Sequence, residues 1–179
     1  MQHDRDPEHR GAACQHDRVQ REDAVDDVAR EVLRRVRGEV PEGEHTVPIG
    51  KARVARQGSE MTVIAYGSSV HLALEAVDQL DEDIEVVDLR TLCPLDSEAI
   101  LASVRKTGKV LIAHEATRAC GAGAEVAGLI GEEAFEDLDA PIRRLTTPDV
   151  PIPFSPPLEQ AVLPQLDDMK GACRELVAY

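Results

Sequence analysis

The chain has 179 residues, enough for one globular domain and an extension, and its apolar residues (42%) are nearly all aliphatic because aromatic residues make up only 2%. A formal net charge of −14 argues against binding to nucleic acid or to an anionic membrane surface. The apolar stretches are far shorter than the roughly 20 residues of a membrane span, and the charged N-terminus lacks the apolar centre of a signal peptide, so we expect a cytoplasmic protein.

Residues 1–37 divide into a polar tail and a helical pattern. The tail, up to about residue 21, is rich in His, Asp and Arg, which is typical of a disordered segment. Residues 22–37 repeat Val and Leu at helical spacing, with acids early and arginines late, and predict an amphipathic helix. Prolines and glycines in residues 38–50 indicate a linker into a domain over 51–179. The tail's metal-binding candidates, which fit no compact metal motif, are His3, His9, Cys14 and His16.

From residue 51 onward, aliphatic strand patterns alternate with helical patterns. This alternation predicts a three-layer α/β/α domain with a mostly parallel five-stranded sheet. A serine after the second strand, Ser68 or Ser69, is expected to cap the first helix, Asp96 or Ser97 the second, and Gly108 to end the second. We expect strands centred near Val54, Val63, Val86, Leu111 and Leu145, helices near 69–80, 97–106 and 122–137, a proline-rich surface crossing over 150–164, and a terminal helix around 167–177.

Polar residues stand at the ends of three of these strands, where ligands of parallel sheets bind. Asp88 and Arg90 flank Leu89, so they either anchor the next loop or pair with each other, or Arg90 faces a substrate or a partner subunit. His114 and Glu115 are the possible catalytic residues, because a histidine there carries a proton near neutral pH and contact with Glu115 would raise its basicity. A hydrogen-bonded structural role for His114 is the alternative.

Glycines and cysteines give weaker signals. Gly121 and Gly123 precede a helix and resemble an anion-binding entry, but tight packing of the helix against a strand explains them more simply. The serines after Gly67 lack the GxSxG pattern of a nucleophile and favour a helix cap. The four cysteines form no CxxC pair and are interpreted as buried or incidental thiols: Cys14, Cys93, Cys120 and Cys173.

Five segments in order carry a family resemblance over about residues 38–164. They are "GKARVARQGSEMTVIAYGSSVHLALEAV", "VVDLRTLCPLD", "KVLIAHEATRACGAGAEV", "DAPIRRLTTPDVPIPFSPPLE" and "LP". The series resembles the C-terminal domain of the beta subunit of thiamine-diphosphate-dependent 2-oxoacid dehydrogenases, a fold shared with the last domain of transketolase. Within that family "HEATRACGAGAE" looks nearest the branched-chain type, although Ala122 stands where the family often has Phe. The resemblance implies that the first strand is antiparallel to the others.

The resemblance also implies partners and cofactors. The complete family enzyme uses thiamine diphosphate and magnesium, and its beta subunit meets an alpha subunit, a second beta subunit and the dihydrolipoyl acyltransferase. The family's pyrimidine-binding domain, with the glutamate that activates the cofactor, has no counterpart here, and no "GDG…N" signature occurs. We therefore expect this chain alone to bind no thiamine diphosphate and to decarboxylate nothing.

Three classes of function remain open from the sequence. The chain is a part of an enzyme that is active only with its partners, a binding or assembly module, or a remnant that still folds. A truncated gene, a frameshifted reading frame and a split subunit would each give such a sequence. In the family, beta subunits meet partly through this domain, so we expect a weak, salt-promoted homodimer whose contact includes Pro151 to Pro157.

Overall fold

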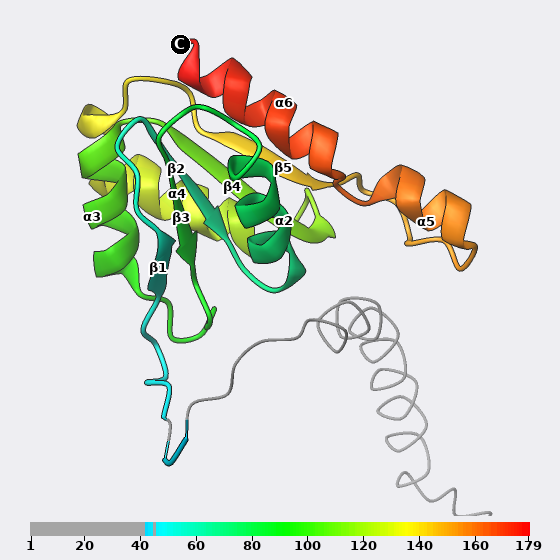
Figure 1. The fold of residues 1–179 in the computed structure, drawn as a ribbon, viewed down its shortest axis with the longest axis horizontal. Helices are drawn as coiled ribbons and strands as arrows, with labels where there is room; N and C mark the ends of the chain where they lie inside the picture. The colour runs from blue at the N-terminus through cyan, green and yellow to red at the C-terminus, as the bar shows by residue number, and fades with distance from the viewer. Residues whose placement is uncertain (1–41, 45) are drawn as a thin grey trace, which may run out of the picture. The chain divides into compact units, whose positions relative to one another are not determined.

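The computed structural model describes residues 42–44 and 46–179, and the interpretations of residues 1–37 lie outside the described residues. The described residues form a five-stranded sheet in the order β1-β3-β2-β4-β5 (Figure 1). β1 pairs with β3 in antiparallel fashion and the other pairs are parallel. All five expected strands and the antiparallel first strand are confirmed: β1 Arg53–Arg56, β2 Met61–Ala65, β3 Ile84–Asp88, β4 Val110–Thr117 and β5 Arg143–Thr147.

Two pairs of helices cover the two faces of the sheet and give the expected three layers (Figure 1). α2, Ser68–Val77, and α6, Leu166–Val177, share one core with the sheet. α3, Ser97–Thr107, and α4, Ala122–Glu133, share the other. Because successive strand residues point to opposite faces, Val63 enters the first core and Ile64 the second. Both cores are built almost wholly from aliphatic side chains, as the composition predicted.

The ends of α3 confirm two predictions about helix termini. Asp96 is the N-cap, and its Oδ1 accepts a hydrogen bond from the Ala99 N–H at 3.4 Å. Its Oδ2 accepts from the Ala52 N–H at 3.0 Å, which ties the start of the domain to this helix. Burial opposes ionisation of this carboxyl, but the two N–H groups and Lys51 together hold its pKa below the usual value. Gly108 ends the helix with a φ of 66°, a left-handed conformation that glycine adopts without strain.

The predicted serine cap of α2 is wrong. The N-cap is Gly67, with a φ of 62°, and Ser68 and Ser69 are already helical and buried. No side chain caps this helix, and the Ser68 hydroxyl has no hydrogen-bond partner among the described residues. The chain leaves the strand at Gly67 in a backbone conformation that suits glycine. The serines therefore lie in the first turn of the helix and not at its N-cap position.

The later elements are also more divided than the sequence indicated. The helix expected over 122–137 ends at Glu133, and a short 3-10 turn, η1, Phe135–Asp137, follows after Ala134 leaves helical geometry at a φ of −143°. The proline-rich crossing contains a helix, α5, Pro156–Val162, which begins with prolines because proline needs no hydrogen-bond partner in a first turn. None of the described helices has both the length and the apolar character of a membrane span.

Candidate functional site

The carboxyl ends of β2 and β4 lie side by side where the strand order reverses. The chain runs from β2 to β3 on one side and then crosses to β4 on the other side of β2. This reversal is the usual place for ligands in parallel sheets, because the loops that follow the two strands diverge there. Tyr66 follows β2 and His114 lies in β4, and their rings stack with centroids 5.5 Å apart.

His114 is completely buried, and neither ring nitrogen has a hydrogen-bond partner among the described residues. Burial lowers the pKa of His114, and the positive charge of Arg144 lowers it further. The polar backbone of Ala116 raises this pKa, but by less than the other two effects lower it. The imidazole is therefore held in its neutral form. Glu115 is not among the groups that set this pKa, and it acts instead on Tyr66, whose pKa is raised by burial and then by the Glu115 charge.

Gly121 and Gly123 let α4 approach this histidine. A Cβ atom on Gly121 would lie 2.8 Å from His114 Cε1, and one on Gly123 would lie 2.6 Å from His114 Cδ2. Both distances are shorter than side chains tolerate, so the two glycines serve close packing of helix against strand. A catalytic role for His114 or Glu115 stays a prediction, because His114 is sealed beneath this helix and Glu115 is half-buried.

Asp88 anchors the loop that follows β3. Its Oδ1 accepts from the Arg90 backbone N–H at 3.1 Å, while Oδ2 lies 3.5 Å from the Arg53 guanidinium. Arg90 has a φ of 58°, and its side chain is exposed. The expected anchoring of the next loop is thus observed. The alternative of an Asp88–Arg90 ion pair is not, since the acid pairs with Arg53 instead.

No metal centre emerges from the described part of the chain, residues 42–44 and 46–179, where no three His, Cys, Asp or Glu residues cluster suitably. Of the cysteines within these residues, Cys93 and Cys120 are exposed and Cys173 is buried. Burial raises the pKa of Cys173 to about 12, so this thiol is an inert part of the core.

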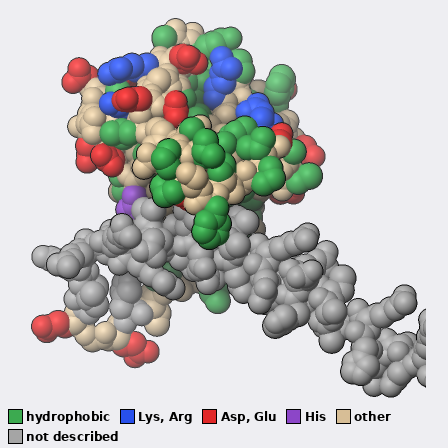
Figure 2. All heavy atoms as spheres, turned by 90° about the vertical axis from the view of Figure 1, so that its right-hand side faces the viewer, with side chains coloured by type: hydrophobic (Ala, Val, Ile, Leu, Met, Phe, Trp, Pro, Cys, Tyr) green, Lys and Arg blue, Asp and Glu red, His purple; other side chains and the backbone are tan. Residues whose placement is uncertain are grey.

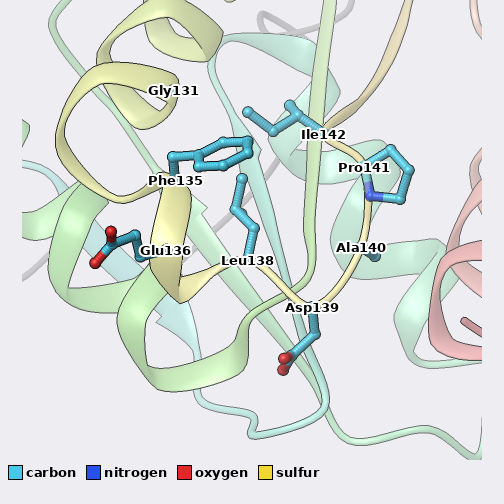
Figure 3. Close-up of a pocket in the computed structure, with 8 residues that line it drawn as sticks. All are labelled: Gly131, Phe135, Glu136, Leu138, Asp139, Ala140, Pro141 and Ile142. Carbon is cyan, nitrogen blue, oxygen red and sulfur yellow. The ribbon is translucent and has the colours of Figure 1, made fainter.

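An open pocket of about 610 Å³ lies where α4, η1 and the loop into β5 meet. The side chains of Phe135, Leu138 and Ile142 point toward one another, whereas the carboxylates of Glu136 and Asp139 point away from them (Figure 3). Phe135 is 71% exposed. We call this feature the apolar pocket; it is lined by Gly131, Phe135, Glu136, Leu138, Asp139, Ala140, Pro141 and Ile142.

Two acidic residues, Glu136 and Asp139, are among those that line the apolar pocket, and further acidic residues neighbour them in the sequence. Glu132, Glu133 and Glu136 are exposed, and so is Asp139. The neighbouring Asp137 is paired with Arg105 at 3.3 Å. The pocket was missed in the sequence, although one signal was present: a phenylalanine in the acidic stretch "GEEAFEDLD" of a chain that has only two phenylalanines.

A second exposed apolar surface runs from Val150 to Leu158, and we call it the proline strip. It contains four prolines and no charged residue, although 30% of the whole chain is charged. Phe154 is fully exposed, and Val150 and Leu158 are 43% and 59% exposed. The strip leads into α5, none of whose residues is buried. Figure 2, which views the side of the molecule that carries α5, shows hydrophobic side chains gathered on this face.

Comparisons with known proteins agree with this architecture. The model of the family described as "Transketolase, C-terminal domain" matches residues 50–169. The chain is similar to the 2-oxoisovalerate dehydrogenase subunit beta of Bacillus subtilis (strain 168), with 46% identity over 150 residues, 82% of this chain and 46% of that protein. It is also similar to the pyruvate dehydrogenase E1 component subunit beta of the same organism, with 41% identity over 83% of this chain and 46% of that protein.

A solved structure supports the fold. The "split gene transketolase, inactive beta4 tetramer" superposes with a TM-score of 0.66 and 28% sequence identity, covering 79% of this chain and 46% of that one. This chain spans a little under half the length of both curated relatives named above.

Proposed function

The chain belongs to the transketolase C-terminal domain family, and from that membership we propose that it is the C-terminal part of the beta subunit of a 2-oxoacid dehydrogenase. Its role in such an enzyme is assembly: it contacts other subunits and docks the acyltransferase core, and it is not catalytic alone. The complete family enzyme uses thiamine diphosphate and magnesium, which the other parts of the assembly would hold. The domain boundaries we propose are a linker over residues 38–50 and a domain over 51–179.

We assign the branched-chain type as the finer class. The support is the motif "HEATRACGAGAE" together with the 46% identity to the 2-oxoisovalerate dehydrogenase subunit beta of Bacillus subtilis. The acetoin:2,6-dichlorophenolindophenol oxidoreductase subunit beta of Bacillus subtilis follows at 43% identity. A preference among 2-oxoacids is therefore a proposal about the assembled enzyme, to be measured with several acids.

The observation that carries the assembly role is the pair of exposed apolar surfaces. A fully exposed Phe154 next to a seven-residue helix with no buried residue is unusual, because so short a helix gains little stability on its own. Contiguous apolar surface of this kind commonly marks a protein–protein contact. We propose that the proline strip contacts a second beta subunit or the alpha subunit.

The apolar pocket is the surface that we propose for the acyltransferase. Its centre is apolar, with Phe135 as an exposed anchor, and two of its lining residues, Glu136 and Asp139, are acidic. This combination suits a partner that presents an apolar side chain flanked by lysine or arginine, because such a partner gains both burial and opposite charge. We propose that this partner is a small basic binding region of the acyltransferase.

The two phenylalanines of the chain provide a matched experiment. Binding of the acyltransferase's subunit-binding region is measured by calorimetry with the unmodified chain, with Phe135→Ser and with Phe154→Ser. We expect Phe135→Ser to weaken binding by about tenfold or more, as loss of an aromatic anchor does. Phe154→Ser should leave this affinity unchanged. Equal affinity for all three chains, or a loss only in Phe154→Ser, would contradict the assignment of the apolar pocket.

A further inference from the structure

A smaller cavity, wide open to solvent, lies on the face of the sheet that α3 covers, at the edge formed by β1, and none of the roles above uses it. Its volume is about 240 Å³. Three residues of α3 that face it are small, and they recur at helical spacing, so the helix leaves space above the strand. We call it the Glu85 cavity; it is lined by Val54, Gln57, Glu85, Ala99, Ala102, Ser103 and Lys106.

One end of the Glu85 cavity is charged. The Glu85 side chain is only 1% exposed, its Oε2 contacts the Lys106 ammonium, and its Oε1 has no hydrogen-bond partner among the described residues. Lys106 Nζ also lies 3.4 Å from Gln57 Oε1, and 40% of the lysine side chain is exposed. A buried carboxylate oxygen without a donor is costly, so this oxygen is the atom at which a ligand gains most.

The neighbouring polar groups do not share this deficit. Thr62 Oγ1 and Thr107 Oγ1 are 2.9 Å apart and share a hydrogen bond, and the Thr107 hydroxyl also lies 3.2 Å from the Ser103 carbonyl oxygen. The polar network under the C-terminal half of α3 is therefore satisfied except at Glu85. The other end of the cavity is apolar, formed by Val54, Ala99 and Ala102.

We propose that the Glu85 cavity binds a small α-amino acid with an aliphatic side chain. The ligand's ammonium group donates to Glu85, and its carboxylate pairs with Lys106, which is long and exposed enough to turn from Glu85 toward the ligand. The aliphatic side chain lies along Val54, Ala99 and Ala102. The cavity is smaller than the sites that hold drug-sized molecules, which restricts the ligand to a few carbons.

The opposite charges of the site select a zwitterion. A simple amine pairs with Glu85 but meets the positive Lys106, and a simple carboxylic acid pairs with Lys106 but leaves the Glu85 oxygen unsatisfied. Only a molecule with both groups on one carbon exchanges the internal Glu85–Lys106 contact for two ligand contacts. The proposal concerns the isolated chain and stands independently of any role in a dehydrogenase.

The test is calorimetry on the full chain with three ligands that share the isobutyl group of the leucine side chain: leucine, 4-methylpentanoate and isopentylamine. We expect saturable binding of leucine and at least tenfold weaker binding of both analogues, each of which lacks one charged group. No saturable heat with leucine up to about 10 mM, the range of a weak small-ligand site, would overturn the proposal. Equal binding of all three would overturn it as well, because an apolar cavity without charge selection gives that result.

Two alanines on neighbouring helices supply the variants. Ala102→Leu fills the cavity and should abolish leucine binding, whereas Ala124→Leu on the exposed side of α4 should leave it unchanged. Circular dichroism of both variants confirms that they fold. In Lys106→Met the preference for leucine over isopentylamine should disappear, because the carboxylate has lost its partner. Leucine binding that persists undiminished in a folded Ala102→Leu chain contradicts the site.

Discussion

The contact between Glu85 and Lys106 makes a quantitative prediction about stability. Glu85 sits in β3 between the aliphatic residues Ile84 and Val86, and Lys106 reaches it from α3. Replacing Lys106 by Met keeps most of the side-chain volume but leaves the carboxylate buried without its cation. Removing one partner of a fully buried ion pair costs about 3–5 kcal/mol. Because 40% of the Lys106 side chain is exposed and water reaches that end of the pair, we expect a loss of about 3 kcal/mol.

The assay is urea unfolding at pH 7, followed by circular dichroism. The double variant Glu85→Gln/Lys106→Met removes both charges and should recover much of the stability, since no uncompensated charge is then buried. Arg105→Met on the same helix is the control: Arg105 and Asp137 are both substantially exposed, so the loss there should stay below about 1 kcal/mol. A loss in Lys106→Met as small as that in Arg105→Met would refute the reasoning, because the pair would then behave as a surface contact.

Three further predictions concern other parts of the fold. Burial holds the pKa of His114 in the folded chain below its usual 6.5, so the unfolded chain binds a proton at this residue at a higher pH than the folded chain does. The stability contributed by the neutral ring is therefore complete above pH 6.5. It is lost as the pH falls through the pKa of the folded state. His114→Leu should therefore lose less stability than the unmodified chain between pH 7 and pH 5 in urea unfolding, and parallel losses would contradict this. Gly123→Ala should lower the stability of the folded chain by about 1–3 kcal/mol, because the added methyl group crowds His114. Gly128→Ala, in open space on the same helix, should raise the stability by about 0.5–1 kcal/mol. Thermal unfolding of the two variants tests this difference. Sedimentation at low and high salt should show a weak homodimer that strengthens with salt, because screening shortens the range of the repulsion between the acidic chains to about 10 Å near 0.1 M. Phe154→Ser should abolish the homodimer. A strict monomer at both salt concentrations would contradict the role of the proline strip in this contact.

The strands were predictable because their signal is local. Met61–Ala65 and Ile84–Asp88 are dominated by aliphatic residues, and such runs belong in a sheet that is covered on both faces. Both ends of α3 were equally predictable, since Asp96 at the N-terminus and Gly108 at the C-terminus act on the backbone close to them in the sequence. The antiparallel direction of β1 came from the family resemblance and not from its residues.

The features that escaped prediction depend on contacts between distant segments. Glu85 pairs with Lys106, which lies 21 positions further along the sequence. No pattern in the residues around Glu85 predicts this partner. The apolar pocket arises where α4, η1 and the following loop meet, so only its phenylalanine was visible beforehand. The helix α5 was not predicted, because the prolines of residues 150–164 pair poorly in a sheet and indicated a surface crossing. Prolines are nevertheless well placed in the first turn of a helix.

Reconstitution tests the central claim most directly. The chain is co-expressed with the alpha subunit of a 2-oxoacid dehydrogenase and with a separate pyrimidine-binding domain, and decarboxylation of 2-oxoacids is measured with thiamine diphosphate and magnesium. Our account predicts that the three parts purify together and decarboxylate, with a preference for branched-chain acids, while this chain alone neither decarboxylates nor gives saturable heat with the cofactor. Decarboxylation by the chain alone, or failure of the folded chain to associate with both other parts, would contradict the account.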